Sequence, residues 1–78
     1  MKAVFVQIKC ELGHTYEVAA KLADKDNPPE LHSTSGAFDL MAKYYIEEGE
    51  DVGQFVAREV HSVPNIRDTF TIITFRAF

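Results

Sequence analysis

A glycine and a carboxylate open one of the apolar stretches of this chain. In SGAFDLMAKYY, residues 35–45, Gly36 and Asp39 stand directly before a run of alternating large side chains. A carboxylate in this position can accept hydrogen bonds from backbone amides of the turn, or it can pair with a cationic group of a ligand. Glycine permits a left-handed turn and lets a ligand approach the backbone closely. The stretch therefore indicates a structural turn, a part of a binding site, or both.

The other residues with catalytic or metal-binding chemistry are scattered. The three histidines, His14, His32 and His61, have spacings that match no metal-ligand motif. Cys10 continues an apolar alternation and has no orienting partner at a suitable spacing, which favours a buried thiol over a nucleophile. We therefore expect no catalytic residue, no metal and no cofactor.

Length and composition describe a small folded protein. The 78 residues are 46% hydrophobic and 26% charged, and the net charge is −4 without a basic cluster. This charge balance speaks against direct nucleic-acid binding. The N-terminal apolar run is too short for a signal sequence or a membrane span, and one cysteine cannot form an internal disulfide. We expect a soluble cytoplasmic protein that oligomerises, because so short a chain buries little surface alone.

Six stretches carry the periodicity of strands or helices. Alternation predicts strands over residues 3–10, 30–35, 38–46 and 67–78, and helical spacing predicts helices over residues 14–25 and 51–61. Pro28 and Pro29 end the first helix, Asp51 or its neighbour caps the second, and Asn65 tolerates a left-handed backbone before the last strand. The second strand is expected at an edge. We treat residues 1–78 as one domain.

The order of these elements predicts an α+β fold of the ferredoxin-like βαββαβ type. Its right-handed crossovers place two helices on one face of a four-stranded antiparallel sheet. The other face keeps large side chains where a solvated face would be polar. These residues are Phe5, Met41, Tyr45, Phe70 and Ile72. We expect a second copy to cover them, forming a homodimer of the dimeric α+β barrel type.

Two short patterns resemble the ligand-binding (RAM) domain of the Lrp/AsnC transcription regulators. They are the Gly36-x-x-Asp39 turn and the Pro64-Asn65-Ile66-x-x-Thr69-x-Thr71 junction, flanked by AVFVQIK and DVGQFV. The similarity runs over nearly the whole chain. Members usually have Pro-Gly-Val where this chain has Pro64-Asn65-Ile66, and asparagine also accepts the left-handed position.

The resemblance implies a regulatory module without enzymatic activity, linked to transcription of amino-acid metabolism. The chain begins at its first strand, so we expect a stand-alone domain without a helix-turn-helix. Similar proteins form dimers and then octameric or decameric rings, and they bind amino acids at contacts between dimers. The implied effector-binding residues are Ser35, Gly36, Ala37, Asp39, Thr69 and Thr71. Asp39 would bind the ammonium of a zwitterion, while amides and hydroxyls would bind its carboxylate.

Two alternatives stay open. Small α+β barrels of this shape include monooxygenases and isomerases, for which His32, His61 or Tyr45 would be the acid or base. The chain could instead bind no ligand and form mixed oligomers with full-length regulators. Thr69, Thr71 and Thr74 also suit a plain strand, where threonine is favoured.

Overall fold

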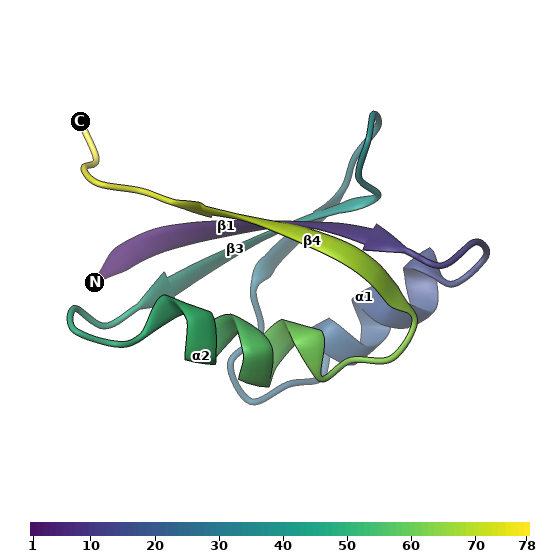
Figure 1. Cartoon of the computed structure of the whole chain (residues 1–78), viewed down its shortest axis with the longest axis horizontal. Helices are drawn as coiled ribbons and strands as arrows, with labels where there is room; N and C mark the ends of the chain where they lie inside the picture. The colour runs from purple at the N-terminus through teal and green to yellow at the C-terminus, as the bar shows by residue number, and fades with distance from the viewer.

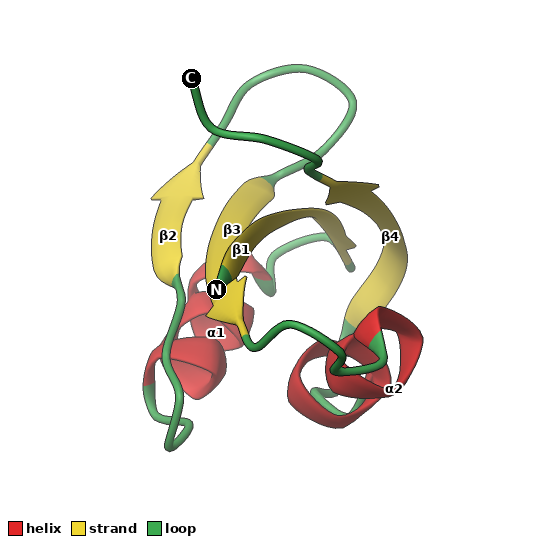
Figure 2. Cartoon of the chain, turned by 90° about the vertical axis from the view of Figure 1, so that its left-hand side faces the viewer, coloured by secondary structure: helices red, strands yellow, loops and turns green.

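The computed structural model describes all 78 residues as one sheet with two helical segments on the same side (Figures 1 and 2). The elements follow the order βαββαβ, and the sheet order is β2-β3-β1-β4 with antiparallel pairing throughout. This confirms the predicted α+β, ferredoxin-like class. The strands and helices are β1 (Lys2–Cys10), α1 (Thr15–Ala23), β2 (Glu30–Ser33), β3 (Leu40–Ile46), α2 (Val52–Val56), η1 (Ala57–His61) and β4 (Ile66–Ile73).

The central strands β1 and β3 form the floor of the core. Alternate residues of β1 are buried beneath the helices, and their cross-strand partners on β3 are buried with them, as Val4 with Tyr44 and Ile8 with Leu40. We call this side of the sheet the helix face. The side chains between them point to the opposite side, because successive residues of a strand alternate. We call that side the open face, which carries Phe5, Met41, Tyr45, Phe70 and Ile72.

Helix α1 begins after a left-handed glycine. Gly13 has a φ of 81°, which turns the chain from β1 into the helix. Val18 and Leu22, one turn apart, are fully buried against the sheet. The helix ends at Ala23, well before Pro28, so it is shorter at its carboxyl end than predicted.

The second helical segment begins and ends where predicted but changes pitch in its middle. The Asp51 side chain caps it by accepting a hydrogen bond of 3.0 Å from the Gln54 amide. Residues 52–56 are α-helical, while residues 57–61 form a π-turn that brings Phe55 and Val60 into the core together. A π-turn lengthens the backbone ring by one residue and displaces carbonyls from the regular ladder.

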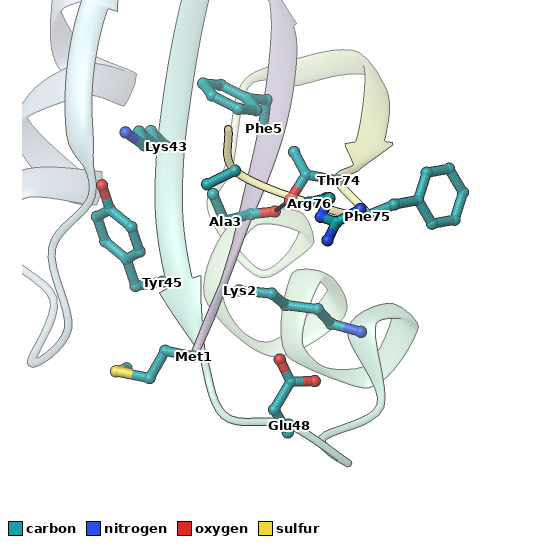
Figure 3. Close-up of a pocket in the computed structure, with 11 residues that line it drawn as sticks. Met1, Lys2, Ala3, Phe5, Lys43, Tyr45, Glu48, Thr74, Phe75 and Arg76 are labelled. Carbon is teal, nitrogen blue, oxygen red and sulfur yellow. Dashed lines mark hydrogen bonds between the residues drawn. The ribbon is translucent and has the colours of Figure 1, made fainter.

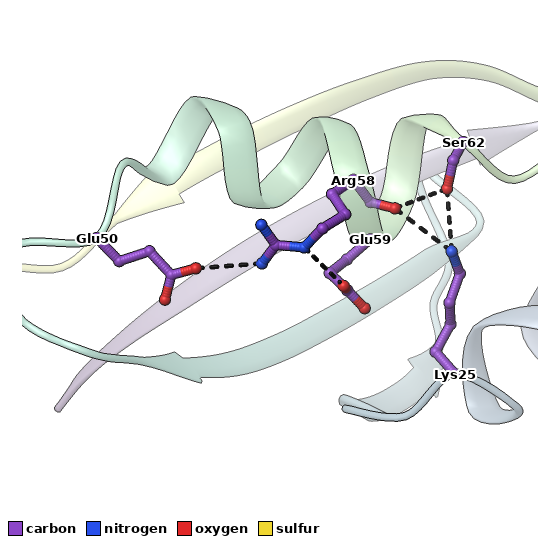
Figure 4. A network of polar contacts seen from close by, with 5 residues as sticks. All are labelled: Lys25, Glu50, Arg58, Glu59 and Ser62. Atoms are coloured by element: carbon purple, nitrogen blue, oxygen red, sulfur yellow. Dashed lines mark hydrogen bonds and ion pairs between the residues drawn. The ribbon is translucent and has the colours of Figure 1, made fainter.

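Polar residues of the π-turn and of the loops near it form a network of hydrogen bonds and ion pairs (Figure 4). The Arg58 carbonyl accepts hydrogen bonds from the Ser62 hydroxyl at 2.7 Å and from the Lys25 ammonium at 3.3 Å. The Arg58 guanidinium pairs with Glu50 and with Glu59, each at 3.1 Å. Lys25 thereby joins the loop after α1 to the end of the second helix.

The last strand is shorter than the alternation of its residues predicted. β4 ends at Ile73 and not at the chain terminus, so residues 74–78 lie outside the sheet. The Thr74 hydroxyl donates to the Ala3 carbonyl, which takes up a backbone acceptor at the end of β1. The strand predicted over residues 38–46 likewise begins only at Leu40, and β2 lies at an edge as expected. None of the helices is long and apolar enough to cross a membrane.

Candidate functional site

The Gly36 turn connects β2 to β3 and is open to solvent. Ser35, Gly36 and Ala37 are all exposed, and Gly36 has a φ of 96°. No atom lies within 4 Å of a Cβ placed on Gly36, so its backbone conformation, not crowding, requires the glycine. The Thr34 amide donates to the Asp39 carbonyl and closes the loop. In Figure 1 the loop rises on the side of the sheet away from the helices.

Asp39 fastens the start of β3 to the end of β1. Its amide donates to the Ile8 carbonyl at 2.9 Å, and its carboxylate Oδ2 accepts from the Cys10 amide at 2.8 Å. The carboxylate thus replaces a backbone acceptor at the point where the β1 register shifts. The structural partner is an amide of β1, 29 residues away, and not an amide of the turn. The second oxygen, Oδ1, makes no hydrogen bond within the chain.

The Cys10 thiol, next to Asp39, is not activated as a nucleophile. Burial raises the pKa of Cys10, and the negative charge of Asp39 raises it further. Cys10 is 4% exposed and belongs to the hydrophobic core. It therefore behaves as the small buried hydrophobe that its place in the alternation predicted.

The two threonines lie across β1 from Asp39. Thr69 pairs with Ile8 and Thr71 with Val6, so both are on the helix face, while Phe70 and Ile72 are on the open face. Because β1 separates β3 from β4, Thr69 and Asp39 are about two strand spacings, or roughly 10 Å, apart. Within one chain, the residues of the turn and strand start lie together: Ser35, Gly36, Ala37 and Asp39. Thr69 and Thr71 lie apart from them.

A shallow cleft of about 250 Å³ surrounds Thr69. Its hydroxyl lies 2.9 Å from Nε2 of His61, at the end of the second helix. Arg67 and Asp68 line the same cleft and were not singled out from the sequence. The signal that could have found them is a charged pair interrupting the strand directly before Thr69. The cleft holds a cation, an anion and a hydroxyl on adjacent residues, a combination suited to polar ligands.

The junction before β4 has the predicted left-handed residue. Asn65 has a φ of 69°, the only positive φ outside glycine. Its carbonyl accepts from the Glu11 amide at 2.9 Å, and its side chain reaches Glu17 on α1 at 3.5 Å. The turn thus places the start of β4 beside the end of β1, where the Thr69 cleft forms.

The open face exposes a row of apolar residues. Tyr45, Phe70 and Ile72 are 48%, 56% and 38% exposed. Lys43 stands among them with its Nζ 4.9 Å from the centre of the Tyr45 ring and 5.7 Å from that of Phe5. The neighbouring Tyr45 raises the pKa of Lys43 above its usual value. At one end of this face lies a groove of about 400 Å³, shown in Figure 3.

The residues named for an enzymatic alternative do not converge. Tyr45 and His32 are both on the open face, on the central strand β3 and the edge strand β2. His61 lies beyond the helix face, where it contacts Thr69. The sheet separates His61 from Tyr45, so the three candidates share no cleft.

Comparison with known proteins gives one family. Residues 3–78 match the family model of the Lrp/AsnC ligand binding domain. The HTH-type transcriptional regulator FL11 of Pyrococcus horikoshii is 28% identical over 72 residues, which are 92% of this chain and 47% of the regulator. FL11 of Pyrococcus abyssi gives the same values. The chain thus spans about half the length of the curated relatives that it matches.

Solved structures share the fold of this chain over nearly its full length. TTHA0845 from Thermus thermophilus superposes with a TM-score of 0.88 at 24% identity, covering 100% of this chain and 98% of that one. The hypothetical protein PHS023 from Pyrococcus horikoshii gives 0.83 at 26% identity, covering 99% and 93%. AsnC of E. coli gives 0.84 at 18% identity, covering 96% and 51%. With the family match over residues 3–78, these findings show that the chain belongs to the Lrp/AsnC ligand-binding domain family.

Proposed function

We propose that the chain is a non-enzymatic regulatory module that binds a free amino acid or a related small metabolite at a contact between subunits. The observation that carries this proposal is the half-engaged Asp39 carboxylate. One oxygen holds the Cys10 amide at 2.8 Å, which fixes the side chain, and the other oxygen is free at the base of an exposed turn. A fixed anion beside exposed backbone amides suits the ammonium and the carboxylate of a zwitterion.

The pocket requires more than one chain. Asp39 and the threonines Thr69 and Thr71 lie on opposite sides of β1, so one copy cannot enclose a small ligand between them. A symmetric assembly brings the Gly36 turn of one subunit against the Thr69 cleft of another. We propose a homodimer formed through the open face, and an octameric or decameric ring of such dimers with effector sites between them.

Ligand binding would act through assembly. A ligand that binds between dimers shifts the equilibrium from separate dimers toward the ring. The size of this shift is set by how much more tightly the ligand binds the ring than the separate dimers. The full-length relatives are HTH-type transcriptional regulators, so we propose that this chain acts in the cytoplasm as one domain over residues 1–78, by contact with such regulators and not with DNA.

The structural neighbour NMB0573 of Neisseria meningitidis was solved as a complex with L-Met, which makes L-methionine a first candidate to test here.

The test removes the negative charge of Asp39 while keeping the hydrogen bond from the Cys10 amide. Asp39→Asn keeps a carbonyl oxygen for the Cys10 amide but removes the negative charge. Asp24→Asn, at the exposed carboxyl end of α1, is the charge-matched control. We would screen the twenty amino acids by thermal shift and measure the tightest by calorimetry.

The proposal expects binding to weaken at least about tenfold in Asp39→Asn, since a charge-assisted hydrogen bond contributes about 1.5–3 kcal/mol, and to stay unchanged in Asp24→Asn. Undiminished affinity in Asp39→Asn would remove Asp39 from the site. A stable oligomer that responds to none of the twenty amino acids would favour the ligand-free oligomerisation partner.

A further inference from the structure

The residues after β4 carry the most exposed rings of the molecule. Phe75 is 99% exposed and Phe78 is fully exposed, three positions apart in a segment of five residues. We call residues 74–78 the arm. In Figure 1 it runs on from β4 beyond the sheet. Single exposed apolar residues are ordinary, but two fully solvated rings beside an already apolar face add to the apolar area exposed at this end of the sheet.

The β1–β4 ladder ends at Thr74, and this is why the arm leaves the sheet. Its hydroxyl donates to the Ala3 carbonyl, the acceptor next to the last β1–β4 pair, and the ladder ends there. The arm then passes along the end of the open face, where residues 74–77 line the groove of about 400 Å³ together with Phe5, Lys43 and Tyr45. Figure 3 shows the Phe75 ring directed away from this groove. The arm therefore lies at the border of the open face with both rings exposed, and the Arg76 guanidinium lies 5.7 Å from the centre of the Phe78 ring.

We propose that the arm is an intermolecular clasp: in the homodimer, Phe75 and Phe78 of each chain pack against the second copy. This inference rests on the open-face dimer proposed above. Two sheets that pack face to face lie about 10 Å apart, and five extended residues reach about 16 Å. A copy stacked on the open face therefore lies within reach of both rings.

The area involved also favours a second copy. A phenylalanine buries about 150–250 Å² when it is enclosed, so four rings in a symmetric dimer supply roughly 600–1,000 Å². A stable interface buries about 1,200–2,000 Å² in total. The arms would thus add about half of what a stable dimer needs, and Tyr45, Phe70 and Ile72 of the open face would supply much of the rest.

The first test compares two double substitutions. Phe75→Ser with Phe78→Ser removes the clasp, while Leu12→Ser with Tyr16→Ser removes two side chains that are 93% and 81% exposed in the β1–α1 region. By sedimentation equilibrium, we expect the dimer dissociation constant to rise more than tenfold in the arm variant and less than twofold in the control. Equal dissociation constants for the arm variant and the wild type would overturn the proposal.

The second test reads the environment of the arm directly. The chain has no tryptophan, so Phe75→Trp introduces a single indole. Its emission should be blue-shifted in the dimer and move to the red when dilution dissociates the dimer. A solvated emission spectrum in the intact dimer would overturn the clasp whatever the dissociation constants are.

A third variant tests the clasp and the open-face dimer independently of each other. Phe70→Asp places a charge in the open face at a residue that is 56% exposed and leaves the arm intact. If Phe70→Asp dissociates the dimer and the arm variant does not, the clasp is wrong and the open-face dimer stands. If the wild type is a monomer at all concentrations, both are wrong.

Discussion

The two faces of the sheet are made by the same strands and differ in what covers them. On the helix face, Val6 and Ile8 are fully buried under two helical segments. On the open face, Tyr45 and Phe70 are about half exposed, although the same residue types are buried in the core as Tyr44 and Phe55. An antiparallel sheet with one solvated face has polar residues on it. The helix face is thus covered by the chain's own helices, while large apolar side chains of the open face stay exposed in the single chain.

The largest expected effect compares two isoleucines on opposite faces. Ile8→Ala removes a fully buried side chain and should lower the free energy of unfolding by about 2–5 kcal/mol. Ile72 is 38% exposed, and Ile72→Ala should cost the single chain at most about 1 kcal/mol. Urea denaturation in a Phe70→Asp background keeps the measurement on the monomer. Equal losses would mean that the two faces do not differ as described.

The second comparison concerns two tyrosines that are both accessible in the single chain. Tyr45 is on the open face and 48% exposed, whereas Tyr16 on α1 is 81% exposed. Tyr45→Ser should weaken the dimer about 10- to 100-fold, because burying such a side chain contributes about 1.5–3 kcal/mol. Tyr16→Ser should leave it unchanged. Light scattering over a dilution series checks both, and a dimer that loses affinity only in Tyr16→Ser would place the interface on the helices.

The smallest effect concerns the border between the faces, where Asp39 meets Cys10. Burial holds the pKa of the Cys10 thiol above its usual value, and Asp39 contributes because its negative charge disfavours the thiolate. Asp39→Asn should therefore lower the pKa of Cys10, while burial still keeps it raised. The NMR chemical shift of the Cys10 β-carbon, followed with pH, measures this. An unchanged or higher midpoint in Asp39→Asn would contradict the electrostatic role of Asp39.

Much of the sheet could be predicted because strand alternation is local. Val4, Val6 and Ile8 repeat every second residue, and this period alone assigns them and Phe5 to opposite faces. The Asp51 cap and the left-handed Asn65 also follow from side-chain chemistry within a few residues. The helix boundaries near His61 were likewise predicted, but the π-turn was not, because it depends on packing Phe55 and Val60 together under the sheet.

Several of the errors and omissions depend on contacts between different elements. β4 was predicted to reach the terminus because its residue types continue, but the Thr74 hydroxyl bonds Ala3, 71 positions away, and the ladder ends. The structural alternative for Asp39 placed its hydrogen-bond partner within the turn, and the partner is instead the Cys10 amide. The cleft of Arg67 and Asp68 was missed because His61 completes it from another element.

The sequence by itself determined the order of the elements, the face on which each strand residue lies, and the family patterns around Gly36 and Thr69, since these depend on neighbours within a few positions. Only the tertiary structure decided that Asp39 keeps one oxygen free, that the threonines lie across β1 from it, and that the rings of the arm stay in solvent. The physical reason is that hydrogen-bond satisfaction and burial are properties of what surrounds a side chain in space, and the chain brings those surroundings together from positions far apart.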